Sequence, residues 1–254
     1  MLMNAKKIVV DGLLTNYVQA GAGRTILLLH GWGDSAAGLQ DLQKKLSESY
    51  EVIAVDLPGF GSTQTPGSIW KLNDYAQFVS SFLGKLDINP YAILGHSNGG
   101  AIAIHGVSSG LLYAEKLVLL ASAGIRDEHK GRKNILRVVA KGAKALTAPL
   151  PRNMQDKIKR KAYQAIGSDL FVAEHLQETF KNIVTADVRK DAANVVVPTL
   201  LIYGDADTAT PVRYGKIFEA AMPYSHLEVV KGAGHFVHID QKDAVYASIQ
   251  RFLQ

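Results

Sequence analysis

The first half of the chain alternates between apolar runs of strand length and longer stretches with apolar residues at helical spacing. Residues 6–20 alternate between apolar and polar positions around Asp11-Gly12, which predicts a β-hairpin. The order that follows is typical of a doubly wound, mostly parallel sheet. The predicted strands span 25–29, 51–55, 91–95 and 116–121, and the predicted helices span 35–47, 72–86 and 97–109.

This alternation stops after Ala121 and resumes at Thr199, which leaves about 75 residues with the pattern of helices and loops. Two further apolar strands follow, over 200–204 and 227–230. We therefore predict an α/β core domain formed by residues 1–122 and 191–254, with residues 123–190 inserted as a helical cap subdomain.

Ser97 stands in a Gly-x-Ser-x-Gly pattern, directly after an apolar run and before small and apolar residues at helical spacing. A serine at such a strand-to-helix turn is held in a strained conformation, and Gly95 and Gly99 let the strand and the helix approach closely. The free N–H groups at the start of the helix point toward the same place. The pattern favours a nucleophilic serine, although it also fits a plain turn.

Candidate acids and a candidate base also follow apolar strands. Asp205 and Asp207 come after the strand 200–204, and His235 comes after the strand 227–230. In an open parallel sheet the loops after the strands gather at the carboxyl edge, so we expect these side chains to meet Ser97 there. A serine hydroxyl needs a neighbouring base, histidine is suited to that task near neutral pH, and a buried acid orients its ring.

Motifs spread along the chain, taken together, resemble those of the α/β-hydrolase family, and in particular its small capped esterase-like members. The resemblance covers almost the whole chain, and several motifs in the family's order are more specific than any one of them. The matching pieces are HGWG at 30–33, DLPGFGS at 56–62, GHSNGG at 95–100, GDADTATP at 204–211 and GAGHF at 232–236.

The resemblance implies an α/β-hydrolase fold, a cap inserted over the site and no cofactor. It implies Ser97 as the nucleophile, His235 as the general base and Asp207 as the acid that orients it. It also implies that the backbone N–H groups of Trp32 and Asn98 form the oxyanion hole. Many relatives carry a larger apolar residue at the position of Asn98, so the chain departs from the family by placing a polar side chain near the pocket floor.

The other acidic residues in or near these motifs have different interpretations. The family spacing, three residues after the glycine and four before the proline, favours Asp207 over Asp205. Asp56 is a plausible acid by chemistry, but its Pro-Gly context indicates a structural turn. Asp240 and Asp243 are expected at the start of the last helix, where carboxylates interact well with free N–H groups.

The other histidines have plainer interpretations than catalysis. Successive residues at a sharp turn point apart, so His96 is expected to pack or to support the site, and His30 is expected to hydrogen-bond within its own loop. His238 follows His235 by three residues without a third ligand nearby. His175 lies near Glu174 and Glu178 in a segment that resembles a solvated helix face. No metal site is predicted.

Composition excludes several other classes of protein. The 254 residues are 47% hydrophobic with a mean hydropathy of +0.04, as in soluble globular chains, and no apolar run is long enough to span a membrane. The chain contains no cysteine, and its first residues do not form a secretory signal. No dinucleotide or P-loop pattern follows a strand, so no nucleotide cofactor is implied. We expect a cytoplasmic protein.

The predicted cap carries the excess positive charge. Residues 123–190 hold 15 Lys and Arg against 7 Asp and Glu, whereas the whole chain is at +5. Part of the cap is predicted to form a basic amphipathic helix, with the basic residues Lys130, Lys133, Arg137, Lys141 and Lys144 along one side. The plain interpretation is a solvated face over the pocket. The alternatives are attraction of anionic substrates or contact with an anionic membrane. Nucleic acid is not expected as a partner.

The sequence therefore predicts a serine hydrolase that cleaves a small or medium carboxylic ester through an acyl-enzyme. A hydrolase of carbon–carbon bonds in ring-cleavage products is the nearest alternative, and lactonase or perhydrolase activity uses similar residues. A ligand receptor without catalysis is a further alternative from a different class. Fold alone does not decide among them.

Overall fold

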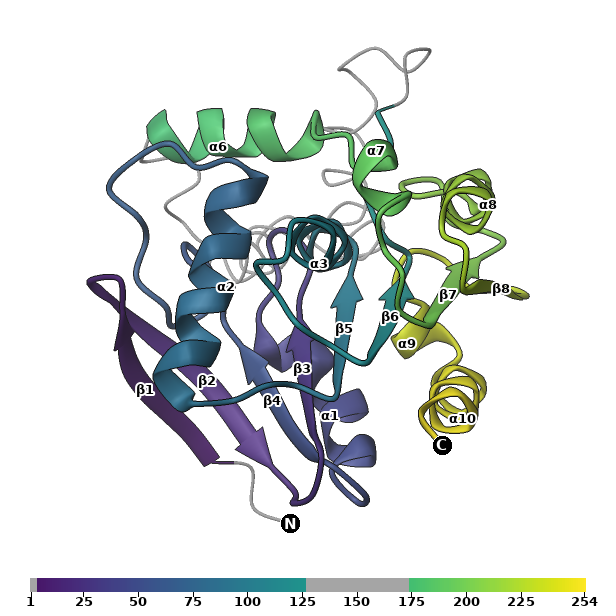
Figure 1. The fold of residues 1–254 in the computed structure, drawn as a ribbon, viewed down its shortest axis with the longest axis horizontal. Coiled ribbons are helices and arrows are strands. Elements are labelled where there is room, and N and C mark those ends of the chain that lie inside the picture. Colours follow the sequence, from purple (N-terminus) through teal and green to yellow (C-terminus); the bar gives the residue numbers. More distant parts are fainter. Residues whose placement is uncertain (1–3, 127–173) are drawn as a thin grey trace, which may run out of the picture.

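The structure is a computed structural model that describes residues 4–126 and 174–254. An eight-stranded sheet, in the order β1-β2-β4-β3-β5-β6-β7-β8, forms its centre (Figure 1). The strands are β1 (Asn4–Val10), β2 (Leu13–Ala20), β3 (Thr25–Leu29), β4 (Glu51–Val55), β5 (Ala92–His96), β6 (Lys116–Leu120), β7 (Thr199–Gly204) and β8 (Ser225–Val230).

The pairing of the strands confirms the predicted topology. β1 and β2 form the antiparallel hairpin, and both residues of its Asp11-Gly12 turn have positive φ. β2 pairs antiparallel with β4, and every pair from β4 to β8 is parallel. The predicted limits of β3 and β4 match the structure, and those from β5 to β8 differ by one or two residues, most at β8, which begins at Ser225.

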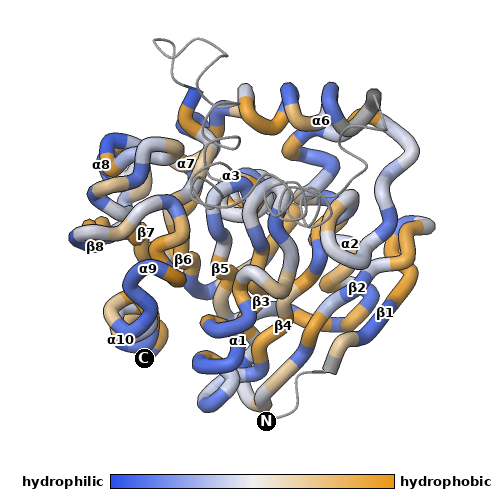
Figure 2. The backbone as a smooth tube through the Cα atoms, turned by 180° about the vertical axis from the view of Figure 1, so that it is seen from behind, coloured by the Kyte–Doolittle hydropathy of each residue, from blue (hydrophilic) through white to orange (hydrophobic). Residues whose placement is uncertain are grey.

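Helices cover both faces of the sheet. α2, α3 and α8 pack on one face, while α1 and α10 pack on the other. Figure 2 shows the apolar central strands enclosed between these layers. The helices are η1 (Ala36–Leu39), α1 (Gln40–Leu46), α2 (Leu72–Leu86), α3 (Asn98–Ser108), α6 (Glu174–Val184), α7 (Arg189–Ala192), α8 (Val212–Ala221), α9 (Val237–Asp240) and α10 (Lys242–Leu253).

The strands in the middle of the sheet are buried on both faces. In β3, Leu27 and Leu29 belong to the apolar cluster on one side, whereas Ile26 and Leu28 belong to the cluster on the other. Such strands read as continuous apolar runs, which is why they were visible in the sequence. None of the helices among the described residues is both long and apolar enough to cross a membrane.

Most of the predicted cap, including its basic amphipathic helix, lies outside the described residues. The described part contains α6, which lies above the start of α2 in Figure 1. The Thr179 hydroxyl of α6 accepts a hydrogen bond of 2.9 Å from the backbone N–H of Trp70. The predicted boundary after residue 190 falls inside α7, which spans Arg189–Ala192. The Asp191 carboxylate of this helix pairs with His105 of α3 at 2.8 Å.

Candidate active site

Ser97 occupies the turn between β5 and α3 in a strained conformation. Its backbone angles, φ of +51° and ψ of −113°, lie in a region that residues other than glycine rarely adopt. A Cβ at Gly95 would lie 2.5 Å from the backbone oxygen of Gly99, and a Cβ at Gly99 would lie 2.2 Å from the backbone oxygen of Leu29. The two glycines of the motif are therefore required by close packing of backbones, as the sequence predicted.

The structure brings Ser97, His235 and Asp207 into one chain of hydrogen bonds. The Ser97 hydroxyl lies 3.0 Å from Nε2 of His235, and Nδ1 of the same ring lies 2.8 Å from Oδ2 of Asp207. The three residues come from loops after β5, β7 and β8, so they meet at the carboxyl edge of the sheet as expected. In this geometry Nδ1 donates to the carboxylate and Nε2 is free to accept the serine proton.

Asp207 is buried and held by donors within its own loop. The backbone N–H groups of Ala209 and Thr210 donate to Oδ1 at 2.7 and 3.1 Å, and the Thr210 hydroxyl lies 2.7 Å from Oδ2. Burial alone raises the pKa of Asp207, but the hydrogen bonds from His235 and Thr210 outweigh it and lower the pKa below its ordinary value. Asp207 is therefore a carboxylate at neutral pH, able to stabilise a charged His235 ring.

The loop that carries His235 is supported on both sides. The carboxylate of Asp240 accepts a 2.7 Å hydrogen bond from the backbone N–H of Gly234. The buried ring of His96 lies on the other side, with Nε2 3.0 Å from the backbone oxygen of His235. Burial, with further contributions from nearby histidines, lowers the pKa of His96 well below its usual value, so the ring is neutral and donates this bond.

These contacts correct one prediction and confirm another. Asp240 does not begin the last helix: it is the final residue of α9, and its carboxylate is used by the loop instead, whereas Asp243 does lie in the first turn of α10. His96 supports the His235 loop and makes no hydrogen bond to the Ser97 hydroxyl among the described contacts, as the sequence suggested.

Trp32 lies on the loop after β3, next to the Ser97 turn. A Cβ at Gly31 would lie 3.2 Å from Cβ of Ser97, so the loop passes directly against the nucleophile. The indole ring of Trp32 packs against Phe60 and Phe180, with ring centroids 4.8 and 5.2 Å away. α6 therefore contributes an aromatic wall beside Trp32.

The other candidate acids have structural partners. Asp205 is exposed, and its Oδ1 accepts a 2.7 Å hydrogen bond from the N–H of Gly232. Asp56 is buried and accepts hydrogen bonds from the Asn16 side chain and from the backbone N–H groups of Ala36 and Ser62, at 2.9, 2.8 and 2.8 Å. Neither lies within hydrogen-bonding distance of His235.

His30 makes the expected hydrogen bond within its own loop and one more. Its Nδ1 donates to the Gly31 carbonyl at 2.7 Å, and its Nε2 accepts from the N–H of Leu57 at 2.9 Å. Burial lowers its pKa, although the Gly31 carbonyl and nearby carboxylates oppose this. The ring thus ties the loop after β3 to the loop after β4.

No cluster of three or more metal-binding side chains occurs in the parts of the chain that the structure describes. His238 is buried, and its ring centroid lies 4.8 Å from that of His96. The side chains of His175 and Glu174 lie outside the described residues, and Glu178 pairs with Lys181.

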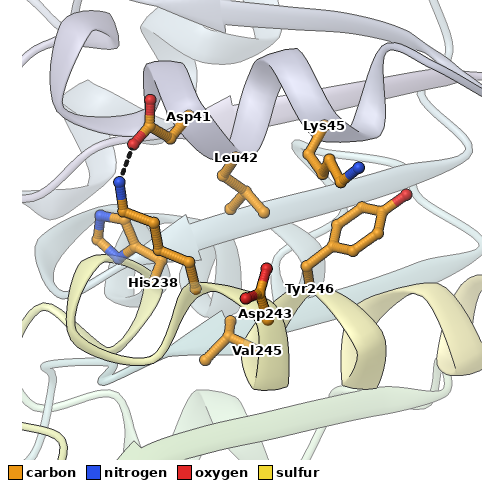
Figure 3. Close-up of a pocket in the computed structure, with 8 residues that line it drawn as sticks. Asp41, Leu42, Lys45, His238, Asp243, Val245 and Tyr246 are labelled. Atoms are coloured by element: carbon orange, nitrogen blue, oxygen red, sulfur yellow. Dashed lines mark hydrogen bonds and ion pairs between the residues drawn. The ribbon is translucent and has the colours of Figure 1, made fainter.

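A hollow of about 150 Å³ lies between α1 and the segment from α9 to α10 (Figure 3). Both lysines that line it have partners: Lys242 pairs with Asp41, and Lys45 lies 5.4 Å from the ring centroid of Tyr246. His238 lines this hollow, but none of the residues that form the Ser97 hydrogen-bond chain does.

Sequence reasoning missed Thr210 and Phe180. The Thr210 hydroxyl lies 2.9 Å from the Ala121 carbonyl and 3.1 Å from Nδ1 of His235, so it links the acid loop to the end of β6. Its position just before Pro211 was the only available signal. Nothing in the sequence pattern pointed to Phe180, because its contact with Trp32 joins segments far apart in the chain.

The chain is similar to known proteins in both sequence and fold. A family model described as "Alpha/beta hydrolase family" matches residues 26–248. An uncharacterized protein of Mycobacterium tuberculosis is 28% identical over 96% of this chain and 79% of its own length. A pimeloyl-[acyl-carrier protein] methyl ester esterase of Aliivibrio salmonicida is 26% identical over 92% of this chain and 94% of its own length.

Among solved structures, a meta-cleavage product hydrolase from Pseudomonas fluorescens superposes with a TM-score of 0.81 at 23% identity. The alignment covers 97% of this chain and 96% of the other, and at this identity it shows a common fold. Because the family model spans nearly the whole chain, the protein belongs to the α/β-hydrolase family, and it is a hydrolase.

Proposed function

We propose that the protein hydrolyses carboxylic esters through an acyl-enzyme, with Ser97 as nucleophile, His235 as general base and Asp207 as the orienting acid. The observation that carries the proposal is the continuous hydrogen-bond chain from the Ser97 hydroxyl through His235 to Asp207. The esterase name of the Aliivibrio relative supports an ester as the substrate.

In the first half of the reaction, the Ser97 hydroxyl attacks the ester carbonyl while Nε2 of His235 takes its proton. The backbone N–H groups of Trp32 and Asn98 stabilise the negative oxygen of the tetrahedral intermediate. The intermediate collapses, and the leaving alcohol takes the proton from His235. This step leaves the acyl group on Ser97.

In the second half, a water molecule attacks the acyl-enzyme and gives its proton to His235. The new tetrahedral intermediate releases the carboxylic acid, and Ser97 regains its proton. Asp207 stays ionised in both halves and stabilises the imidazolium that forms twice in each cycle. Its lowered pKa suits this task because the carboxylate must not take up a proton itself.

The first test uses a fluorophosphonate probe and a panel of p-nitrophenyl and methyl esters. We expect the probe to label the wild type covalently and the wild type to hydrolyse esters of the panel. Ser97→Ala should lose both labelling and turnover, while its thermal unfolding midpoint stays unchanged. Losing a nucleophile of this kind costs several orders of magnitude in kcat.

The panel also includes a dienoic ring-cleavage product, since hydrolysis of carbon–carbon bonds was the nearest alternative from sequence. Turnover of that compound without turnover of the esters would reject the proposal. Absence of labelling together with absence of turnover would favour the receptor hypothesis.

A further inference from the structure

Unpartnered buried polar atoms gather around the site. Within the described residues, the buried side-chain nitrogens without a hydrogen-bond partner are on Trp32, His96, Asn98 and His238. All four residues are close to the site. His96 and Asn98 flank Ser97, His238 follows His235 by three residues, and Trp32 lies on the loop that passes against the Ser97 turn. Burying a donor without an acceptor costs about 1–3 kcal/mol, so such atoms call for an explanation.

The two histidines give no argument for a ligand beside Ser97. Burial lowers the pKa of both His96 and His238, so each ring is neutral and only one of its nitrogens carries a proton. Both nitrogens of His238 lack a partner among the described residues, but this ring lines the hollow beside α1. For His96 the bare nitrogen is Nδ1, because Nε2 donates to the His235 carbonyl. A Cβ at Gly31 would lie 3.1 Å from this Nδ1, so the backbone there leaves little room.

Trp32 and Asn98 differ because their unpartnered nitrogens always carry hydrogen. The indole Nε1 of Trp32 is a donor only, and the amide Nδ2 of Asn98 has two donors. The Asn98 side chain belongs to a residue that is only 4% exposed. Both nitrogens therefore lack an acceptor oxygen within residues 4–126 and 174–254.

The positions of these two residues indicate which part of a substrate lies near them. Asn98 directly follows Ser97, and the loop of Trp32 touches the Ser97 turn through Gly31. Their backbone N–H groups are those assigned to the ester carbonyl oxygen, whereas the leaving oxygen must lie near Nε2 of His235 to receive its proton. Trp32 and Asn98 therefore lie on the acyl side of the ester.

The motif segments that carry or adjoin the two nitrogens have no basic side chain, which favours a neutral acceptor over an anion. The segments 30–33, 95–100 and 232–236 contain no Lys or Arg. A carboxylate buried against neutral donors alone would lack a counter-charge, which is costly. A neutral ketone or hydroxyl oxygen avoids this cost.

We propose that the side chains of Asn98 and Trp32 form a subsite for a neutral acceptor oxygen on the acyl part of the substrate. The preferred substrates are then esters of oxo or hydroxy acids rather than of plain fatty acids. This inference rests on the proposed function of Ser97, and it assigns to the two side chains a task separate from that of their backbone N–H groups.

The test compares p-nitrophenyl hexanoate with its 4-oxo and 5-oxo derivatives, which differ from it only by one ketone oxygen. Each kcat/KM is divided by the rate of hydroxide hydrolysis of the same ester, so that intrinsic reactivity cancels. We expect wild type to prefer at least one oxo ester by about tenfold, the value of one well-made hydrogen bond plus relief of an unpaired donor. Asn98→Leu should bring the ratio close to one.

Three further variants keep the test decisive. Asn98→Ala removes the amide without adding bulk, so it covers the case in which leucine does not fit. Trp32→Phe removes the indole N–H and keeps an aromatic ring, and Trp70→Phe is its matched control, because Trp70 packs on Tyr75 and Phe78 instead. Trp32→Phe should lower the oxo preference, whereas Trp70→Phe should keep it.

Equal corrected kcat/KM for the three esters in wild type would overturn the inference, as would an oxo preference that survives in both Asn98 variants. Failure of the proposed function looks different. It would appear as plain-ester turnover that persists in Ser97→Ala, or as no turnover of any of the esters.

Discussion

Asp56 and Asp207 are both buried carboxylates that follow a parallel strand at the carboxyl edge of the sheet, yet they have different partners. Asp56 accepts hydrogen bonds only from an amide side chain and two backbone N–H groups. Asp207 accepts from its own loop and also from His235, which in turn contacts Ser97.

The difference teaches that burial and position do not make a carboxylate part of an active site. The donors around Asp56 never change charge, so its contacts hold the loops after β3 and β4 in place. In the proposed mechanism, Asp207 faces a ring that gains and loses a proton, so its charge acts on the reaction. The partner, rather than the residue type, separates the two tasks.

Neutralising Asp207 should have the largest effect on kcat. Asp207→Asn should lower kcat by about 10⁴-fold, because the amide no longer accepts from Nδ1 and favours the wrong tautomer of His235. Asp205→Asn, two residues away and exposed, is the matched control and should change kcat by less than about threefold. Steady-state kinetics on one p-nitrophenyl ester measures both. The reverse order would mean that Asp205 is the acid.

Neutralising Asp56 should act on stability instead. Asp56→Asn places an amide where three donors converge, and we expect the free energy of unfolding to fall by about 2–3 kcal/mol. The kcat per folded molecule should stay near wild type. Urea unfolding, followed by fluorescence, measures the free energy of unfolding. Titration with the fluorophosphonate probe counts the active molecules, so that kcat can be given per folded molecule. A large loss of kcat with unchanged stability would remove the distinction between the two acids.

The buried histidines predict how stability responds to acid. Burial lowers the pKa of His30, beside Leu57, and of His96, beside the His235 loop, so the folded state resists protonation. Below the ordinary histidine pKa of about 6.5 the unfolded chain binds more protons than the folded one, so stability falls as pH drops. Thermal unfolding midpoints at several pH values between 5 and 8 measure this.

Single variants assign the effect to one region or the other. His30→Gln and His96→Gln should each flatten the pH dependence, and His96→Gln should also change the pH profile of kcat because it alters the support of His235. Midpoints that are independent of pH over this range would contradict the expectation.

The smallest expected effect concerns the basic segment of the predicted cap, which lies outside the described residues. If its charge attracts anionic substrates, reversing Lys133, Arg137 and Lys141 to Glu should lower kcat/KM severalfold for an anionic ester and spare a neutral one of similar size. Added salt should reduce the difference, because charges are screened over about 8–10 Å near physiological ionic strength. If the reversal affects both esters equally and the wild type does not bind liposomes, the basic residues form only a solvated surface.

The order of the elements and the candidate nucleophile could be predicted from sequence for local reasons. The buried strands are continuous apolar runs, and Gly95 marks a close approach to Gly99 and Gly100, its neighbours in the chain. The loops that hold Ser97, Asp207 and His235 could be placed at one edge, because parallel strands all point the same way. The choice of Asp207 over Asp205 was implied by the family spacing, and the hydrogen bond to His235 agrees with it.

Sequence alone therefore determined the fold class, the edge of the sheet that carries the site and the residue types that meet there, since these depend on hydrophobic periodicity and strand direction. Only the tertiary structure decided that Asp240 supports the His235 loop, that Thr210 joins the acid loop to β6, and that Asn98 and Trp32 have unpartnered donors. Each of these depends on hydrogen bonds within a few ångströms between packed loops. Periodicity along the chain carries no information about which polar atoms find partners when the loops come together.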